Sequence, residues 1–154
     1  MSILFKLFSK KTKIITAADE TTKALKIELR TLFKYPKSKI YYELGPLFRL
    51  WGFIDIYAKY YDVKDDKDCE KVCAMVFNEL FGLSKATKML EQLIKFQKDP
   101  KIKKEQETEF KKSPGDVPID SPAGHFLEGR ENGAYTIKYG KGGILEGYFK
   151  GRLE

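Results

Sequence analysis

The sequence predicts an α+β fold, in which a mainly α-helical bundle of about four helices is followed by a small antiparallel β-hairpin or sheet. Two patterns support this prediction. Apolar residues recur at helical spacing from residue 16 to residue 98, whereas residues 125–154 combine frequent glycines with alternating apolar and polar positions. A highly charged and proline-rich stretch separates the two patterns.

The chain therefore divides into four segments. A chain of 154 residues with 42% hydrophobic content has enough apolar side chain to fill one core. Because nearly all periodic apolar positions lie in the second segment, we expect that segment to fold without the tail. The segments are a basic amphipathic N-terminal segment (1–15), the helical bundle (16–98), a charged helix with a proline-rich connector (99–124) and the glycine-rich β tail (125–154).

The first two helices of the predicted bundle differ in how much of their surface is apolar. The first runs from about Asp19 to Lys34, where Tyr35-Pro36 ends it. The second begins near Gly45-Pro46, with the proline in the first turn. It is apolar on more than one face, which is typical of a helix covered on both sides, so we place it at the centre of the bundle.

The third and fourth helices each carry a single apolar stripe. Asp65 or Asp66 caps the third helix, and Gly82 ends it. Ser84 caps the fourth, which ends before Asp99-Pro100. Connections of a few residues favour antiparallel neighbours in a compact bundle.

The tail is predicted to form two strands. Ala134–Tyr139 alternates in character, Gly140–Gly143 forms a turn, and Ile144–Phe149 forms the second strand. An exposed strand edge is a site for strand addition by a partner protein. The predicted partner-binding residues are Tyr135, Ile137, Tyr139, Tyr148 and Phe149.

A short motif occurs twice in the tail. Leu-Glu-Gly-x-x-x-Gly ends at Gly133 and, eighteen residues later, at Gly151, which suggests stacked hairpins. Gly133-Ala-Tyr-Thr followed by Gly142-Gly-Ile-Leu-Glu-Gly-Tyr-Phe-Lys-Gly151 resembles a single MORN-type repeat. The resemblance covers residues 133–151 and implies a β-hairpin unit that acts in interaction or lipid contact. The helical part carries no family resemblance.

The N-terminal segment is the one basic and aromatic cluster in the chain. On a helix, its apolar residues share a face opposite several lysines, which is the layout of an interfacial helix. The alternative is a helix that packs on the bundle. The predicted membrane- or polyanion-binding residues are Phe5, Phe8, Lys6, Lys10, Lys11 and Lys13.

No catalytic or metal-binding pattern is recognisable. Cys69 and Cys73, the only cysteines, lie four apart in an apolar stripe, which favours buried thiols in a reducing compartment. Two cysteines and the lone His125 are too few soft ligands for structural zinc. We predict no cofactor and no metal, and the sequence favours a non-enzyme.

These observations favour a non-enzymatic, cytoplasmic protein-protein interaction protein that binds a partner, or a second copy of itself, through the bundle and the tail. A bacterial immunity or adaptor protein has this profile. The net charge of +7 keeps a basic RNA-binding protein or small nuclease, with catalytic residues near His125, as the first alternative. The second alternative is a peripheral membrane protein anchored weakly by its N-terminus.

Overall fold

All regular secondary structure in the described residues is helical. The computed structural model describes residues 3–35 and 38–153, and the side chains of residues 3–8 and of residue 114 lie outside the described part. No strand occurs in this part of the chain, so the predicted α+β class with its β-hairpin tail is wrong. The α-helices are α1 (Ile3–Glu28), α2 (Leu44–Tyr60), α3 (Asp66–Phe81), α4 (Leu83–Lys98), α5 (Pro100–Phe110), α6 (Pro122–Tyr139) and α7 (Ile144–Leu153), and the 3-10 helices are η1 (Arg30–Lys34), η2 (Lys39–Tyr42) and η3 (Pro114–Asp116).

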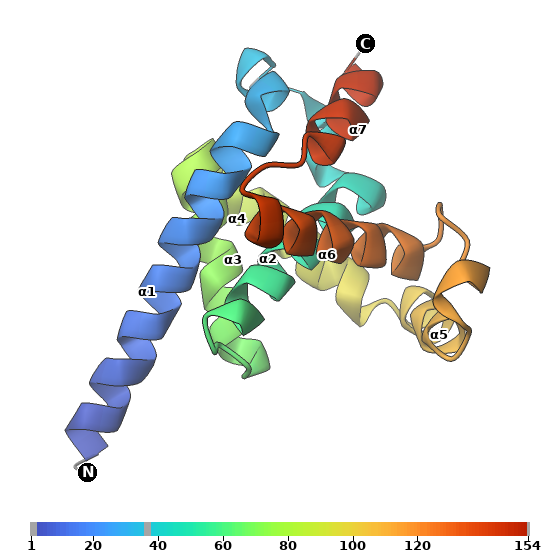
Figure 1. The fold of residues 1–154 in the computed structure, drawn as a ribbon. Helices are drawn as coiled ribbons and strands as arrows, with labels where there is room; N and C mark the ends of the chain where they lie inside the picture. The colour runs from blue at the N-terminus through green and yellow to red at the C-terminus, as the bar shows by residue number, and fades with distance from the viewer. Residues whose placement is uncertain (1–2, 36–37, 154) are drawn as a thin grey trace.

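The N-terminal segment and the first predicted helix form one continuous helix, α1. No glycine or proline lies between Ile3 and Glu28, so nothing in the sequence interrupts it. The helix gives way to η1 after Glu28, earlier than the predicted end at Lys34. Figure 1 shows that the first turns of α1 extend beyond the other helices.

The second, third and fourth predicted helices are confirmed as α2, α3 and α4. Asp65 caps α3, because its Oδ1 accepts hydrogen bonds from the backbone nitrogens of the next turn. The N-cap of α4 is Gly82 rather than the predicted Ser84, and its φ of 84° is one that glycine adopts without strain. Their inward faces fill the core with fully buried side chains such as Phe53, Phe77 and Met89.

The central helix α2 is covered by α6 at unusually close range. A Cβ on Gly129 would collide with the carbonyl oxygen of Arg49, and one on Gly52 would collide with the carbonyl oxygen of Phe126. The absence of side chains therefore lets the two backbones approach each other. Because α6 covers this side of α2, a fragment of residues 16–98 would leave it exposed, and independent folding of that fragment stays a prediction.

The segment predicted as a connector and a strand carries the local signals of a helix, α6. The Oγ of Ser121 accepts from the nitrogen of Gly124, and Pro122 occupies the first turn, where its missing N–H costs nothing. Gly140 ends the helix in the left-handed conformation, with a φ of 79°. Residues 133–151 thus comprise the end of α6, a loop and α7, and the hairpin implied by the MORN resemblance is not formed.

The last helix is held against the end of α1 by a buried carboxylate. Glu28 accepts hydrogen bonds from the nitrogens of Gly142 and Gly143, at 2.6 and 2.8 Å, in the loop that joins α6 to α7. The Leu145 and Phe149 side chains, one helical turn apart, then enter the core. The glycine turn predicted at Gly140–Gly143 is therefore a loop between helices rather than between strands.

Candidate functional site

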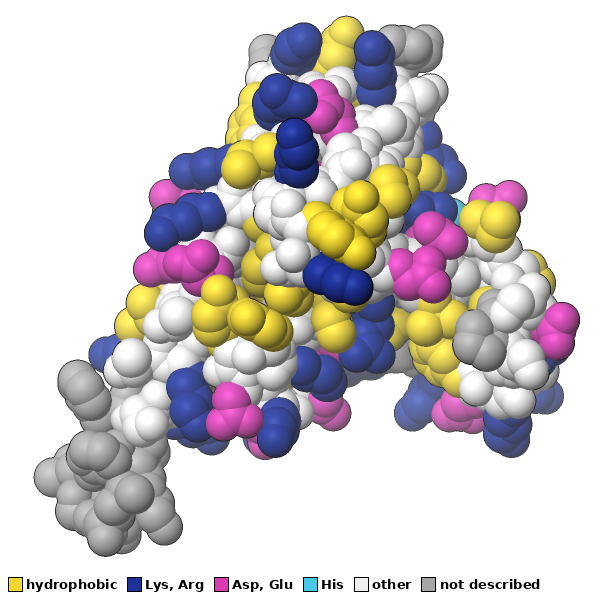
Figure 2. Space-filling view, in the orientation of Figure 1, with side chains coloured by type: hydrophobic (Ala, Val, Ile, Leu, Met, Phe, Trp, Pro, Cys, Tyr) yellow, Lys and Arg dark blue, Asp and Glu magenta, His cyan; other side chains and the backbone are white. Residues whose placement is uncertain are grey.

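Two tyrosines form an exposed aromatic pair on the C-terminal half of α6. Tyr135 is 46% exposed and Tyr139 is 57% exposed, and their ring centroids lie 4.6 Å apart. Residues four apart on a helix are neighbours on one face, so α6 itself positions the pair. We call Tyr135 and Tyr139 the tyrosine surface. Figure 2 shows apolar side chains gathered over this end of α6, with charged side chains around them.

Basic and apolar residues adjoin the tyrosine surface. The Lys138 ammonium lies 5.1 Å from the Tyr139 ring centroid, and Lys141 is exposed in the following loop. A Cβ on Gly142 would lie 3.5 Å from the Tyr135 ring, which places the pair beside the loop that Glu28 holds. Ile144, next along the chain, is 51% exposed. The pair therefore sits on a well-anchored part of the fold, with Lys138 and Lys141 beside it.

The other three predicted partner-binding residues are turned toward the molecule. Ile137 is partly buried against the core, and Phe149 is fully buried within it. Tyr148 is also partly buried, with its ring between the guanidinium groups of Arg49 and Arg152, whose central carbons lie 3.9 and 4.6 Å from the ring centroid. Alternation along a strand would have put Tyr135, Ile137 and Tyr139 on one face, whereas the helix turns Ile137 away from the two tyrosines.

A buried polar cluster joins α2, α6 and α7 around His125. The Nε of Arg49 donates to His125 Nδ1 at 3.2 Å, and the Arg49 Nη1 lies 4.0 Å from a carboxylate oxygen of Glu128. Both Arg49 and His125 are buried. Because Nδ1 accepts this hydrogen bond, the neutral imidazole carries its proton on Nε2.

Burial, together with the nearby charges of Arg49 and Arg152, lowers the pKa of His125 from 6.5 to about 4. The histidine is therefore neutral at neutral pH. A general acid or base has to reach its substrate, and this side chain is enclosed by packing. The geometry thus favours a structural role for His125 between the helices over a catalytic role.

Two of the predicted anchoring lysines pair with acidic residues of the same chain. Lys10 lies 3.1 Å from Asp68, and Lys13 lies 2.7 Å from Asp62. Lys11 is exposed. Phe5, Lys6 and Phe8 fall outside the described side chains.

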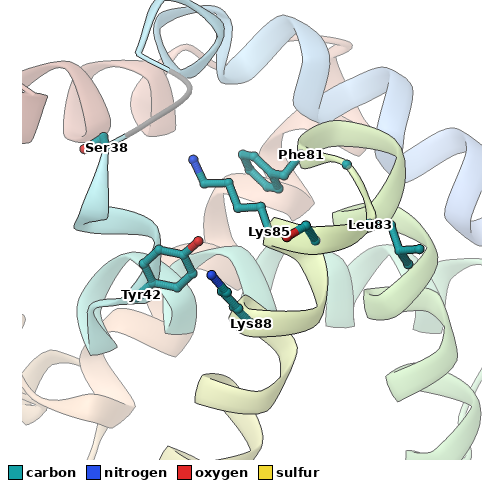
Figure 3. Close-up of a pocket in the computed structure, with 8 residues that line it drawn as sticks. Ser38, Tyr42, Phe81, Leu83, Lys85 and Lys88 are labelled. Carbon is teal, nitrogen blue, oxygen red and sulfur yellow. The ribbon is translucent and has the colours of Figure 1, made fainter.

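A basic hollow of about 480 Å³ lies between η2 and the start of α4. Figure 3 shows Lys85 and Lys88 extending from α4 toward the side where Ser38 and Tyr42 lie. The Lys85 ammonium is already placed 3.9 Å over the Tyr41 ring, and burial lowers its pKa. The sequence pattern does not predict this hollow, because its residues come from two distant segments.

Metal-binding clusters and membrane-crossing helices are both absent from the described part of the chain. No group of three or more His, Cys, Asp or Glu side chains there is arranged to hold a metal ion. None of the helices in the described ranges combines the length and the apolar character that crossing a bilayer requires.

Comparison with known proteins adds no information about the site. No known protein family matches the chain, and no curated protein or solved structure matches it either. The MORN resemblance therefore stays a prediction about ancestry, while its implied strands are absent from the described residues.

Proposed function

We propose that this chain is a non-enzymatic binding protein that holds an acidic protein partner at the tyrosine surface. The observation that carries the proposal is the exposure of Tyr135 and Tyr139, at 46% and 57%, on a helix whose opposite face is packed closely on α2. Tyrosines are enriched at the centres of protein interfaces because each ring buries a large area and loses little conformational entropy. Contact between the two rings, whose planes are tilted by 46°, restrains them before any partner arrives.

The charge around the pair supports an acidic partner. Lys138 and Lys141 are exposed beside it, and the net charge of the chain is +7. Arg30, two residues after Glu28, and Glu146, three residues after Gly143, neutralise each other at 3.1 Å. Complementary charge steers association and disfavours basic partners.

Site-specific photo-crosslinking tests the location of the interface. A photoreactive phenylalanine analogue in place of Tyr139 should form a covalent adduct with a protein in cells that express the chain. The matched control replaces Tyr60, which is 63% exposed and contacts Tyr61 at the end of α2. Equal crosslinking from both positions would argue against a specific surface on α6.

Binding with the purified partner then tests the chemistry. The double substitution Tyr135→Ala/Tyr139→Ala should weaken binding by more than about 2 kcal/mol, as expected for interface hot spots. Tyr60→Ala should leave it unchanged, and Lys138→Glu/Lys141→Glu should slow association at low salt. Retained affinity in the double tyrosine variant would refute the proposal, as would an adduct formed only with a second copy of this chain.

A second candidate function, contact with an anionic membrane surface, is favoured by the course of α1. The first turns of this helix extend beyond the others (Figure 1), and the sequence there places lysines opposite apolar residues. Vesicles containing phosphatidylserine should bind the intact chain in a salt-sensitive manner. Deleting residues 1–8 should abolish that binding with little change in melting temperature. A sharp loss of stability would instead show that the segment supports the fold.

A further inference from the structure

A separate cavity of about 340 Å³ lies between α2, α3, α4 and α5 and shares no residue with the tyrosine surface. Its apolar wall comes from Trp51 on α2 and from Leu90, Leu93 and Ile94 on α4. The volume falls within the range of small-molecule sites, which combine apolar walls with a few polar groups. The polar groups of this cavity decide which molecule fits.

The first polar group is a buried amide without a partner. Gln106 on α5 lines the cavity and is only 8% exposed, and its Nε2 has no hydrogen-bond partner among the described residues. Leaving a buried polar group unpaired costs roughly 1–3 kcal/mol, so each such group calls for an explanation. The Nε2 itself is enclosed by protein atoms, so a hydrogen-bond acceptor in the cavity reaches it after the side-chain amide rotates. The α5 side therefore offers a donor to a ligand.

Charges of opposite sign line two sides of the same cavity. Lys103 comes from α5, the helix that also carries Gln106, whereas Asp66 and Glu70 come from α3. A third carboxylate, Asp55 on α2, is already held by two basic side chains at 2.6 and 3.5 Å. One side thus suits a carboxylate, and the facing helix suits an ammonium group.

The two free cysteines extend the apolar wall. Cys69 and Cys73 both line the cavity and are buried, and burial raises the pKa of each thiol. The Sγ of Cys69 donates to the carbonyl oxygen of Val63 at 3.4 Å. Protonated, buried thiols behave as small apolar groups rather than as nucleophiles. They therefore add apolar contact area and no further charge.

We infer that this cavity binds a small zwitterion with an apolar body, the simplest example being a free amino acid with an apolar side chain. The ligand carboxylate accepts from the Gln106 amide and faces Lys103. Its ammonium group faces Asp66 and Glu70, and its apolar side chain packs on Trp51. The unpaired Gln106 amide and the opposed charges of Lys103 and of Asp66 and Glu70 thereby gain partners.

The only tryptophan of the chain lines the cavity, so its fluorescence reports occupancy directly. The full-length protein is titrated with three probes of one shape: L-phenylalanine, phenethylamine, which lacks the carboxylate, and 3-phenylpropionate, which lacks the amine. L-phenylalanine should saturate the signal and bind at least about tenfold tighter than either analogue, because each analogue leaves polar groups unpaired. The absence of a saturable change, or equal affinity for all three probes, would overturn the inference.

Substitutions at the cavity wall test which residues contact each end of the ligand. The double substitution Asp66→Asn/Glu70→Gln should bring the affinities of L-phenylalanine and 3-phenylpropionate together, because the ammonium group loses both of its partners. Gln106→Met should bring those of L-phenylalanine and phenethylamine together. If Gln106→Met only raises the melting temperature and leaves all affinities unchanged, the amide is a packing defect and the inference fails.

A matched control separates this inference from the proposed protein interface. Tyr139→Ala should leave all three probe affinities at their wild-type values, since Tyr139 lies outside the cavity. Loss of probe binding in that variant would overturn the inference. Because the same variant also tests the protein interface, either proposal can be refuted without refuting the other.

Discussion

The motif Leu-Glu-Gly-x-x-x-Gly occurs once in α6 and once in α7, and the two copies do different things. In α6, Gly129 and Gly133 face the backbone and side chains of α2 at distances that leave no room for a Cβ. In α7, a Cβ added to Gly147 or Gly151 would meet nothing within 4 Å. The same seven-residue pattern therefore makes an interhelical contact in α6 and remains free of close contacts at its glycines in α7.

The difference shows that glycine spacing alone does not specify a contact. Each glycine in a helix interior costs up to about 1 kcal/mol relative to alanine. In α6, close packing on α2 offsets that cost. In α7, the apolar pair Leu145 and Phe149 anchors the helix, and the glycines add nothing to its packing.

Gly129→Ala should give the largest effect. Its Cβ would collide with the Arg49 carbonyl oxygen, a backbone atom that cannot move without displacing α2. We expect the free energy of unfolding to fall by about 3 kcal/mol, at the upper end for overpacked sites. Urea denaturation measures it. A loss below about 1 kcal/mol would show that α6 does not approach α2 this closely.

Acidification should give the next effect, through a buried histidine that links the two helices. His125 of α6 meets Tyr148 of α7, with ring centroids 6.3 Å apart, and burial lowers its pKa from 6.5 to about 4. Between these values the unfolded chain binds a proton that the folded chain does not, so falling pH favours unfolding. The melting temperature of the wild type should therefore drop more steeply from pH 6.5 to pH 4 than that of His125→Gln. If the melting temperatures of the two proteins fall in parallel with pH, the imidazole is not buried as described.

Gly133→Ala should give a smaller loss, about 1 kcal/mol. Its Cβ meets the Cγ2 of Ile56, a side-chain methyl that can shift without displacing the backbone of α2. The comparison with Gly129→Ala distinguishes a backbone obstacle from a side-chain obstacle on the same face. Equal losses for the two variants in urea denaturation would remove that distinction.

Gly147→Ala should give the smallest change, and with the opposite sign. The position lies inside α7 with open space around it, so alanine should stabilise the protein by about 0.5–1 kcal/mol through helix propensity. Thermal unfolding at matched concentration measures the gain. Destabilisation would mean that this glycine stripe is packed against something after all.

The sequence predicts the central bundle well because its signals are local. Capping at Asp65 and the single apolar stripe on α3 are each contained within a few turns of chain, and the buried, free state of Cys69 and Cys73 follows from that stripe. The candidate site is predicted only in part. Tyr135 and Tyr139 are exposed, but Tyr148 and Phe149 are packed inward, because the prediction assumes strand alternation where a helix forms.

Sequence by itself determined where most helices of the bundle begin and end, since apolar period and capping act over short stretches of chain. Tertiary structure decided how the glycines of the tail are used. Ser121 and Gly140 mark the ends of α6 locally, but the glycines between them lower its helix propensity. The close approach of α6 to α2, more than seventy residues earlier in the chain, offsets that cost. The exposure of the tyrosine pair and the opposed charges of the α3–α5 cavity also follow from tertiary packing, which joins residues that no local pattern connects.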